Sequence, residues 1–474
     1  MPLPEVIVRR GDRGAAELPA DDVSTRFEAV VCERGPVEVP IEVRSVSQLR
    51  TRVGDHTGYS TLRAVESYFA EGGARAVLSR VVGPAHRTAT LELRDDRAAT
   101  VLTVRAEGPG SWYHGVRVTA ASDTTSARMV TVDLDGAELV RGVCASALEA
   151  QDLINRSGYA TATIGVGTWP PVASSTPQPL AGGDDDYAGI RDRQAVAALT
   201  AFDESLGAGS VCASGWTTVL MHTALADHAA ATNRLARADM PDIADVATLA
   251  TDAAAIRRLP NARYIQLLAG YPQITTAGVT IPVPPSGVHT GREAQADREN
   301  GAGPGQPCAW TFGEYATPVS VRTAWSRAQR EQLLDAGITV IVQDARGEVY
   351  AEDAITAVDP IRYPQYAEVS AMRVTMAIHA QAKAVLRRHV KRTIDGRGHL
   401  AAVATGDLVA ICADWYSRDA LYGESSGDAF HASVVADTSP EVRPRLVGYL
   451  ALRPSPSAHT IELTITQVAA GDTI

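Results

Sequence analysis

The sequence predicts an α/β protein with several domains, and three observations indicate this fold class. The chain has 474 residues, enough for roughly two to four domains of ordinary size. Residues 90–167 contain runs in which apolar and polar residues alternate with the period of two that β-strands show. From about 187 to 358, helical and strand-like runs follow one another, as in layered domains built around a largely parallel sheet.

The first 90 residues contain an arm and the start of a folded core. Residues 1–22 include one extended stretch, EVIVRR, and no helical periodicity, so we expect an arm there. Two β-rich runs then surround a break at Gly35-Pro36. A helix is expected over 59–73, where Ser60 can cap its start and two glycines can end it. The run ARAVLSRVV after it predicts a buried strand.

A β-rich module follows, formed by the runs TLELRDD, TVLTVRAEG, GVRVTAAS and MVTVDLDGAELVRGV. Asp135-Gly136 lies between two alternating runs, which is a strong signal for a hairpin. The Pro- and Ser-rich stretch WPPVASSTPQPLAGGDDD is interpreted as a linker that closes the module.

The next segment alternates between helices and strands. Helices are expected at RQAVAALTAFDES, TTVLMHTALADHAAATNRLAR and AWSRAQREQLLDAG, and strands at GSVCAS, ARYIQLLAG and ITVIVQDA. Gly337 stands where the last of these helices should end. Residues 271–318 are rich in Gly and Pro and are interpreted as a long excursion from this core. Residues 366–418 predict two helices, and the run PRLVGYLALRPSPSAHTIELTITQV after them predicts strands.

The composition argues against several classes of function. A formal net charge of −11 disfavours general affinity for nucleic acid, which requires clustered Lys and Arg. No apolar run reaches about 18 residues, and the start MPLPEVIVRRGDRG lacks the pattern of a signal peptide, so neither membrane insertion nor export by a signal is expected. The cysteines are five and far apart, which favours reduced thiols in a cytosolic compartment over disulfides or a zinc site: Cys32, Cys144, Cys212, Cys308 and Cys412.

The stretch GPGSWYHG, residues 108–115, is the first candidate for chemistry. A phosphate-binding loop requires Lys followed by Ser or Thr after its last glycine, and Gly115 is followed by Val116. His114 has no acid, Cys or second His at ligand spacing nearby. A structural turn is therefore favoured over a catalytic or nucleotide-binding loop.

A serine hydrolase is the main alternative from another class. Ser210 and Ser214 follow a predicted strand, with His222 and His228 on the next helix, but neither serine has the flanking glycines of a nucleophile elbow. A triad assembled from distant segments stays open, and a fluorophosphonate probe would label it. The acids of GDDD, 183–186, could hold a cation, although no further ligands follow and a solvated turn or helix start is favoured. We predict no catalytic, cofactor or metal site.

The strongest charge pattern is KAVLRRHVKR. Lys383, Arg387 and Lys391 are four residues apart and are expected to stack on one helical face, with Arg388 and Arg392 beside them. The pattern indicates either a docking stripe or a solvated helix face that complements the C-terminal dipole.

Several stretches, taken in order, resemble contractile tail sheath proteins of bacteriophages and related injection systems. RFEAVVCERGPVEVPIEVRSVSQLRTRVGDHTGYSTLRAVESYFAEGGARAVLSRVVGPA resembles the family's opening, and AEGPGSWYHGVRVTA resembles a structural turn of the family. Four further stretches resemble its later segments: LAGGDDD, GYPQITTAGVTIPVPPSGVHTGREAQADRENGAG, DALYGESSGDAFHASV and SAHTIELTITQV. The N-terminal PEVIVRR and the segment GITVIVQDARGEVYAEDAITAVD depart from the family pattern.

This resemblance implies a fold in which a subtilisin-like but non-catalytic α/β middle domain carries an inserted β-sandwich, followed by a C-terminal α+β domain, with extended arms at both ends. The implied divisions are an N-terminal arm, the N-terminal part of the sheath core, the β-sandwich, the subtilisin-like domain and a tube-facing domain with the C-terminal arm: 1–22, 23–90, 91–177, 178–358 and 359–474.

The resemblance also implies a function and partners. Sheath subunits form stacked hexameric rings around a tail tube, as part of a virion assembled in the host cytoplasm, and contract to drive the tube through a cell envelope. The implied partners are further copies of the chain, the tail tube, the baseplate and a tail terminator, with no cofactor, nucleic acid or membrane insertion. The sheath of a bacterial injection system or bacteriocin is an alternative.

Two sets of residues follow as site predictions. Arm strands that join subunits are expected to contain Val6, Ile7, Val8, Ile461, Leu463 and Ile465. The tube is expected to face Lys383, Arg387, Arg388, Lys391 and Arg392.

Overall fold

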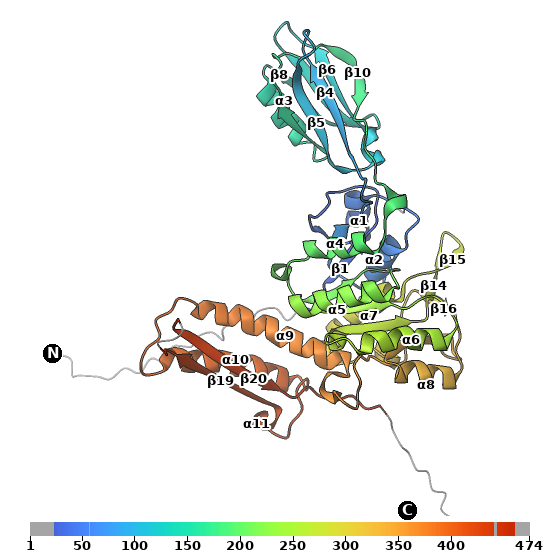
Figure 1. Ribbon diagram of the computed structural model, residues 1–474, viewed down its shortest axis with the longest axis vertical. Coiled ribbons are helices and arrows are strands. Elements are labelled where there is room, and N and C mark those ends of the chain that lie inside the picture. Colours follow the sequence, from blue (N-terminus) through green and yellow to red (C-terminus); the bar gives the residue numbers. More distant parts are fainter. Residues whose placement is uncertain (1–22, 56, 440–442, 460–474) are drawn as a thin grey trace, which may run out of the picture. The chain divides into compact units, whose positions relative to one another are not determined.

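The computed structural model describes residues 23–55, 57–439 and 443–459 (Figure 1). These residues belong to two units, an α/β unit of residues 23–372 and a C-terminal unit of the described residues from 373 onward. Helix α9 (Val369–Leu386) continues from the first unit into the second. Within the described ranges, no helix combines the length and apolarity needed to cross a membrane.

The α/β unit is built on an eight-stranded sheet. Its strands are parallel except at the two edges, where β2 and β18 run antiparallel to their neighbours. The order across the sheet is β18 (Val349–Ala351), β17 (Ile338–Gln343), β13 (Ile265–Ala269), β12 (Arg234–Asp239), β11 (Gly209–Cys212), β1 (Arg26–Val30), β3 (Ala76–Arg80) and β2 (Ile41–Val43). The largely parallel sheet predicted from the sequence is confirmed.

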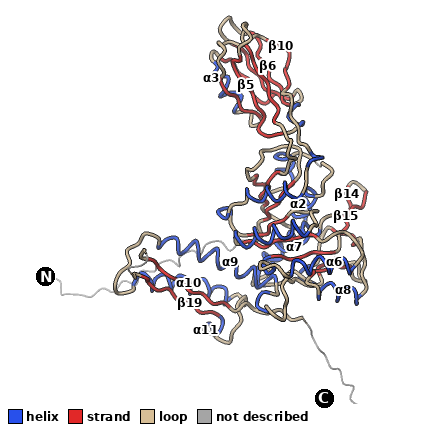
Figure 2. The backbone as a smooth tube through the Cα atoms, viewed as in Figure 1, coloured by secondary structure: helices blue, strands red, loops and turns tan. Residues whose placement is uncertain are grey.

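Helices cover both faces of this sheet (Figure 2). One face packs apolar side chains against α4 (Asp192–Ala198), α5 (Val219–Thr232), α6 (Val246–Arg257) and α8 (Arg327–Asp335). The other face lies under α1 (Val46–Val53), α2 (Thr61–Ala70) and α7 (Pro285–Glu299). Because alternate residues of a strand point to opposite faces, Phe27 joins the first layer and Val30 the second.

Local sequence explains most of the helix ends. The hydroxyl of Ser45 accepts a bond from the Gln48 backbone at the start of α1, and Ser326 forms a capping box with Gln329 at the start of α8. Gly337 adopts φ +86° where α8 ends, as predicted. Ser60 precedes α2 as expected, but its side chain makes no capping bond.

Residues 271–318 are not simply an excursion, and that expectation is wrong for α7. The segment contains the strands β14 (Pro272–Thr276) and β15 (Val279–Pro282) and ends at the start of β16 (Pro318–Val321), but α7 between β15 and β16 is largely buried. A Cβ atom at Gly287 would lie 2.5 Å from the Ala64 carbonyl oxygen, and one at Gly291 would lie 2.4 Å from that of Tyr68. The glycines therefore let α7 approach the backbone of α2, a purpose that apolar periodicity does not reveal.

The module predicted to be β-rich consists of two antiparallel sheets that share one apolar core with α3 (Ala147–Asn155). One sheet has the order β4 (Thr88–Arg94), β5 (Thr100–Pro109) and β9 (Ala160–Ile164). The other has the order β10 (Ser174–Pro179), β6 (Val116–Ser122), β7 (Arg128–Leu134) and β8 (Ala137–Cys144). The predicted hairpin is confirmed, with Asp135 at φ +48° and Gly136 at φ +89°.

The structure agrees with one of the two predicted linking segments and corrects the other. GPGSWYHG is a turn, as favoured: a 3₁₀ helix over Ser111–Gly115 connects β5 to β6. The buried Tyr113 hydroxyl accepts a bond from the Gly35 backbone at 3.0 Å, and His114 Nε2 accepts one from that of Gly183 at 3.1 Å. The Pro- and Ser-rich stretch is not only a linker, because part of it is β10, a proline-bearing edge strand.

Arg80 joins the β-rich module to the large sheet. Its buried guanidinium group forms an ion pair with Asp185 and donates to the backbone carbonyl groups of Gly35 at 2.7 Å, Glu33 at 2.8 Å and Pro109 at 2.8 Å. GDDD is not a simple solvated turn, because Asp185 is buried in a charged contact, but it does lead into a helix as the alternative expectation had it, with Asp186 directly before the 3₁₀ helix Tyr187–Gly189. No cluster of metal-binding side chains is found in the part of the chain that the structure describes.

Among its described residues, the C-terminal unit contains two long helices, one short helix and a hairpin. The two predicted helices are confirmed as α9 and α10 (His399–Ser417), and the indole N–H of Trp415 donates to Gln381 at 2.8 Å between them. After the short α11 (Ser426–Ala429), β19 (Phe430–Asp437) pairs with β20 (Arg445–Leu452) and packs on α10.

We predict that Arg80→Met lowers the free energy of unfolding by about 3–5 kcal/mol, because it leaves the buried Asp185 carboxylate without its partner. Urea denaturation followed by tryptophan fluorescence measures the loss. Arg87→Met is the matched control, since Arg87 is 70% exposed beside Asp184 and its removal should cost about 0–1 kcal/mol. Equal effects of the two substitutions would contradict the assigned role of Arg80.

Candidate functional site

The sheet face beneath α7 is polar where most sheet faces are apolar. Arg26 and Glu28 of β1 are fully buried and form an ion pair at 2.5 Å. Arg26 also donates to the Ser286 carbonyl oxygen at 2.8 Å and to the hydroxyl of Thr290 at 2.6 Å, both on α7. The hydroxyl of Ser214, which follows β11, accepts from Arg26 at 2.6 Å. One guanidinium group thus connects β1, β11 and α7.

Asp239 extends this network at the end of β12. Its carboxylate accepts from the backbone N–H of Ser286 at 2.7 Å, from the Ser286 hydroxyl at 3.0 Å and from the backbone of Gly215 at 3.1 Å. Burial raises the pKa of Asp239 to about 6. The N-terminus of α7 favours the ionised form, since the helix dipole places partial positive charge there.

A second buried pair lies further along α7. Arg237 of β12 forms an ion pair with Glu293 and also donates to Gln266 of β13. Gln266 in turn donates to the hydroxyl of Thr339 at 3.0 Å. The polar network therefore reaches from β1 to β17. Most of its donors and acceptors are used by other protein groups, but the buried Nε of Arg26 has no hydrogen-bond partner.

This geometry does not form the serine hydrolase site that the sequence left open. The hydroxyl of Ser214 contacts Arg26, Glu28 and Ser286, and Ser210 accepts a bond from Arg237. His222 lies 3.0 Å from the Asp239 carbonyl oxygen, and His228 lies 3.2 Å from Arg234. Neither histidine contacts either serine, and both serines are buried. The serine–histidine pair that activates a nucleophile is absent from these four positions.

Sequence reasoning missed most of this network. Its charged residues alternate with apolar residues in their strands, which is typical of a sheet with one solvated face: Arg26, Glu28, Arg237 and Asp239. The available signal was the polar α7 segment, whose side chains match that face. The five cysteines are all buried, and the structure shows no disulfide among them.

The hairpin of the C-terminal unit exposes apolar side chains on its outer face. Its inner face packs Val434 against α10, while Val435 and Tyr449 on the outer face are 60% and 62% exposed. Among the described residues, β19 and β20 pair only with each other, so neither outer edge is paired with a further strand, although the backbone N–H of Val434 donates to the Thr405 hydroxyl of α10 at 3.0 Å. A two-stranded ribbon is marginal alone, and open edges accept further strands. The six predicted arm-strand residues lie outside the described residues.

The basic set is exposed, but its predicted helical stacking is wrong. Helix α9 ends at Leu386, Arg387 begins a 3₁₀ turn, and Lys391 adopts φ +68° beyond it. The buried His389 explains this end, because its ring contacts the Asp407 carboxylate of α10 at 2.6 Å and draws the chain away from the helical path. The side chains of the set are nevertheless all exposed: Lys383, Arg387, Arg388, Lys391 and Arg392.

We predict that His222 makes the protein acid-sensitive. Burial lowers the pKa of His222 to about 4, so the stability that its neutral ring contributes is present above pH 6.5 and is lost as the pH falls toward 4. The free energy of unfolding falls when the pH is lowered from 7 to 5. We expect this fall to be about 2 kcal/mol smaller in His222→Gln than in the wild type.

The comparison between the two proteins isolates His222, because Asp239 acts in the opposite sense in both. With its pKa raised to about 6, Asp239 contributes stability at low pH that is lost as the pH rises through that value. Urea titrations at the two pH values supply the measurement, and parallel losses in both proteins would count against the prediction.

Comparisons with known proteins relate this fold to one group. No protein-family model matches the chain, and no curated protein matches it in sequence. A sheath tail protein from Listeria innocua is similar in structure, with a TM-score of 0.66 and 14% identity over 92% of this chain and 96% of that one. A sheath tail protein from Desulfitobacterium hafniense gives a TM-score of 0.58 and 15% identity over 94% and 100%.

Injection-system sheaths are similar as well. The helical sheath of the anti-feeding prophage in its contracted state gives a TM-score of 0.55 and 14% identity over 98% of this chain and 99% of that one. The sheath of the extracellular contractile injection system PVC, also in the contracted state, gives a TM-score of 0.57 and 11% identity over 98% of each chain. The mixed α/β architecture predicted from the sequence is confirmed, and the chain has the fold of the contractile tail sheath family.

Proposed function

We propose that the protein is a structural subunit of a contractile tail sheath. It polymerises as stacked hexameric rings around a tail tube and contracts to drive the tube through a cell envelope. The observation that carries this proposal is the likeness to sheath proteins over nearly the whole chain, including a sheath in its contracted state. The protein has no enzymatic role in this proposal, a view supported by Ser214, whose hydroxyl is held by Arg26 and Glu28.

The divisions implied by the family resemblance belong to the same proposal. Residues 178–358 are a subtilisin-like α/β domain without catalysis, and residues 91–177 are an inserted β-sandwich. Two antiparallel sheets that share one core support the inserted domain. Residues 23–90 are the N-terminal part of the sheath core, and residues 359–474 form the tube-facing domain with the C-terminal arm.

Strand exchange joins the subunits in this proposal. Arm strands that contain Val6, Ile7 and Val8, or Ile461, Leu463 and Ile465, add to the open edges of β19 and β20 in neighbouring copies. Main-chain hydrogen bonds suit such a joint because they depend little on side chains and persist while subunits rotate. The support is the two-stranded sheet, which has a free edge on each side among the described residues.

The partners follow from the assembly. The exposed basic set of the C-terminal unit faces an acidic tail tube, and the baseplate and a tail terminator close the sheath at its ends in a phage tail particle. An injection-system or bacteriocin sheath is the alternative, favoured by the likeness to the sheath of an extracellular contractile injection system.

We predict that deletion of residues 1–20 abolishes tube formation and leaves folded monomers, because the arm completes a neighbour's sheet. Electron microscopy of the purified protein detects the tubes, and circular dichroism checks the fold. Val6→Thr with Val8→Thr is the matched control, since Thr retains β-propensity and the main-chain bonds. Normal tubes from the truncated protein would contradict the arm model.

We predict that Arg387→Glu with Lys391→Glu weakens assembly on tubes while polymerisation without tubes persists. The effect should be greatest at low salt, because each exposed ion pair contributes only about 0–1 kcal/mol and is screened by salt. Co-sedimentation of sheath with purified tubes measures it. The control is Arg94→Glu with Arg327→Glu, which changes the net charge equally at exposed positions of the α/β unit. Unaltered co-sedimentation at low salt would assign the tube contact elsewhere.

A further inference from the structure

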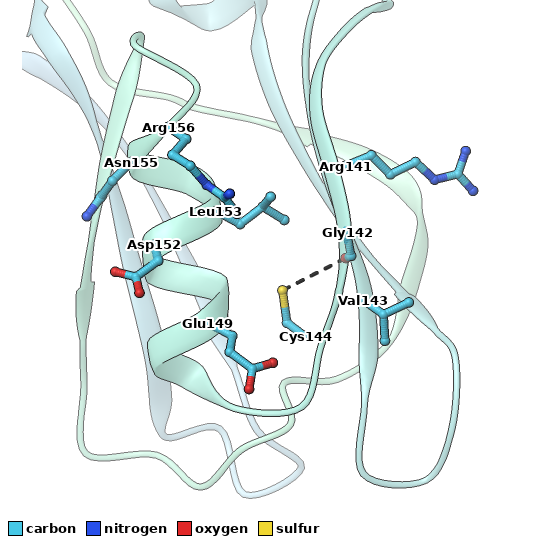
Figure 3. A pocket seen from close by; sticks show the side chains of 9 residues that line it. All are labelled: Arg141, Gly142, Val143, Cys144, Glu149, Asp152, Leu153, Asn155 and Arg156. Carbon is cyan, nitrogen blue, oxygen red and sulfur yellow. Dashed lines mark hydrogen bonds between the residues drawn. The ribbon is translucent and has the colours of Figure 1, made fainter.

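The groove between strand β8 and helix α3 does not define a ligand (Figure 3). Its volume is about 720 Å³, and it lies beside the outer edge of β8, which among the described residues pairs only with β7. Arg141 points away from α3 in Figure 3 and forms an ion pair with Glu138 at 3.8 Å. The other charged side chains of the lining have both signs: Glu149, Asp152 and Arg156.

The buried network beneath α7 contains a chain of four oxygen atoms. The chain runs from Glu28 through the hydroxyl groups of Ser214 and Ser286 to Asp239. Glu28 Oε2 lies 3.2 Å from the hydroxyl oxygen of Ser214. The two hydroxyl oxygens are 2.9 Å apart, and that of Ser286 lies 3.0 Å from Asp239 Oδ2. All four residues are at most 1% exposed, so a contact left without a proton is costly.

The three contacts of this chain require three protons, but its two hydroxyl groups supply only two. Arg26 donates to Glu28 at 2.5 Å and to Ser214 at 2.6 Å. Each of these protons lies between nitrogen and oxygen, and none lies between two oxygen atoms of the chain. If both carboxyl groups are ionised, one contact therefore brings two lone pairs together, whichever way the hydroxyl groups turn. One proton on a carboxyl group completes all three hydrogen bonds.

Asp239 is the carboxyl group better suited to hold this proton. Burial raises the pKa of Glu28 as well, but a proton on Glu28 would break its direct ion pair with Arg26. Ionised Asp239 adds a second buried negative charge beside the single positive charge of Arg26. Burial raises the pKa of Asp239 to about 6, and the backbone N–H groups of Ser286 and Gly215 limit the rise.

Other titratable and charged groups surround Asp239 on the elements packed against it. His222 of α5 contacts its carbonyl oxygen at 3.0 Å, and burial lowers the pKa of His222 to about 4. Burial raises the pKa of Cys212 in β11 to about 12 and also raises that of Tyr271, which precedes β14. These three groups therefore keep their charge near neutral pH. The remaining groups are bonded to protein partners: Arg26 with Glu28, Arg237 with Glu293, and His289 with Tyr315.

We propose that Asp239 and the two serines form a pH-sensitive attachment of the N-terminal turn of α7. The protonated carboxyl group donates to the Ser286 hydroxyl, which donates to Ser214, and Ser214 donates to Glu28. When the pH rises, the proton passes to the solvent, one contact of the chain loses its hydrogen bond, and the turn opens more often. The proposal does not depend on the sheath function, since it rests on the α/β unit alone.

The test is hydrogen exchange of the full chain at pH 5 and pH 8, followed by mass spectrometry of peptides that cover residues 285–291. Asp239→Asn supplies the third proton at every pH through its amide N–H. A carboxyl group whose pKa is raised to about 6 stabilises the closed turn at low pH, and this contribution is lost as the pH rises. The fall in protection from pH 5 to pH 8 should therefore be about tenfold larger in the wild type than in Asp239→Asn.

Asp242→Asn is the matched control. It removes one negative charge three residues further on, where the carboxylate pairs with Arg322 at the surface. Protection in this variant should change with pH as in the wild type. Equal changes in the wild type and in Asp239→Asn would overturn the proposal, as would loss of the pH dependence in Asp242→Asn.

Infrared spectroscopy of the wild type adds a measurement that does not require a variant to fold. The carbonyl stretching band of a protonated carboxyl group should disappear with a midpoint near pH 6, above the pKa of about 4 that exposed carboxyl groups have. The band should persist in Asp242→Asn and be missing in Asp239→Asn. A wild type without a band that titrates above pH 5, or a band that survives in Asp239→Asn, would also overturn the proposal.

Discussion

The buried ion pair between Arg26 and Glu28 is the interaction on which the α/β unit depends. Each ion would be costly to bury alone, and the two are tolerated because Ser214, Ser286 and Thr290 supply further hydrogen bonds. This requirement fixes the position of α7, since its first turns must meet β1 and Asp239 together. The polar helix can occupy the centre of the unit only because the sheet beneath it is polar as well.

The distribution of hydrogen-bonding capacity separates the interior from the sites that remain available. In the α/β unit, serines and charged groups that could have served chemistry are engaged with one another, as in the contact of Arg237 with Glu293. Strand edges without a further strand are found instead on both sides of the β19–β20 hairpin and along β8, among the described residues. Such edges favour roles in which the protein binds other chains through its backbone.

Periodicity was sufficient for elements whose burial follows the ordinary rule. Apolar runs such as AVLSR of β3 and ITVIV of β17, and the Asp135-Gly136 turn, were predicted and are found. Prediction failed where a side chain far along the chain decides the outcome. Helix α9 ends at Leu386 because His389 contacts Asp407, eighteen positions later, and Asp185 is buried because Arg80 reaches it from β3.

By itself, the sequence determined the α/β class, the parallel sheet, the β-rich module and the two C-terminal helices, because these follow from the spacing of apolar residues and from turn residues nearby. Only the tertiary structure decided that the polar α7 is central, that Ser214 contacts Arg26 and no histidine among those predicted, and that β8 retains an open edge beside a groove. These features depend on which distant groups satisfy a buried charge or cover a strand, and the spacing of residues along the chain does not show which groups these are.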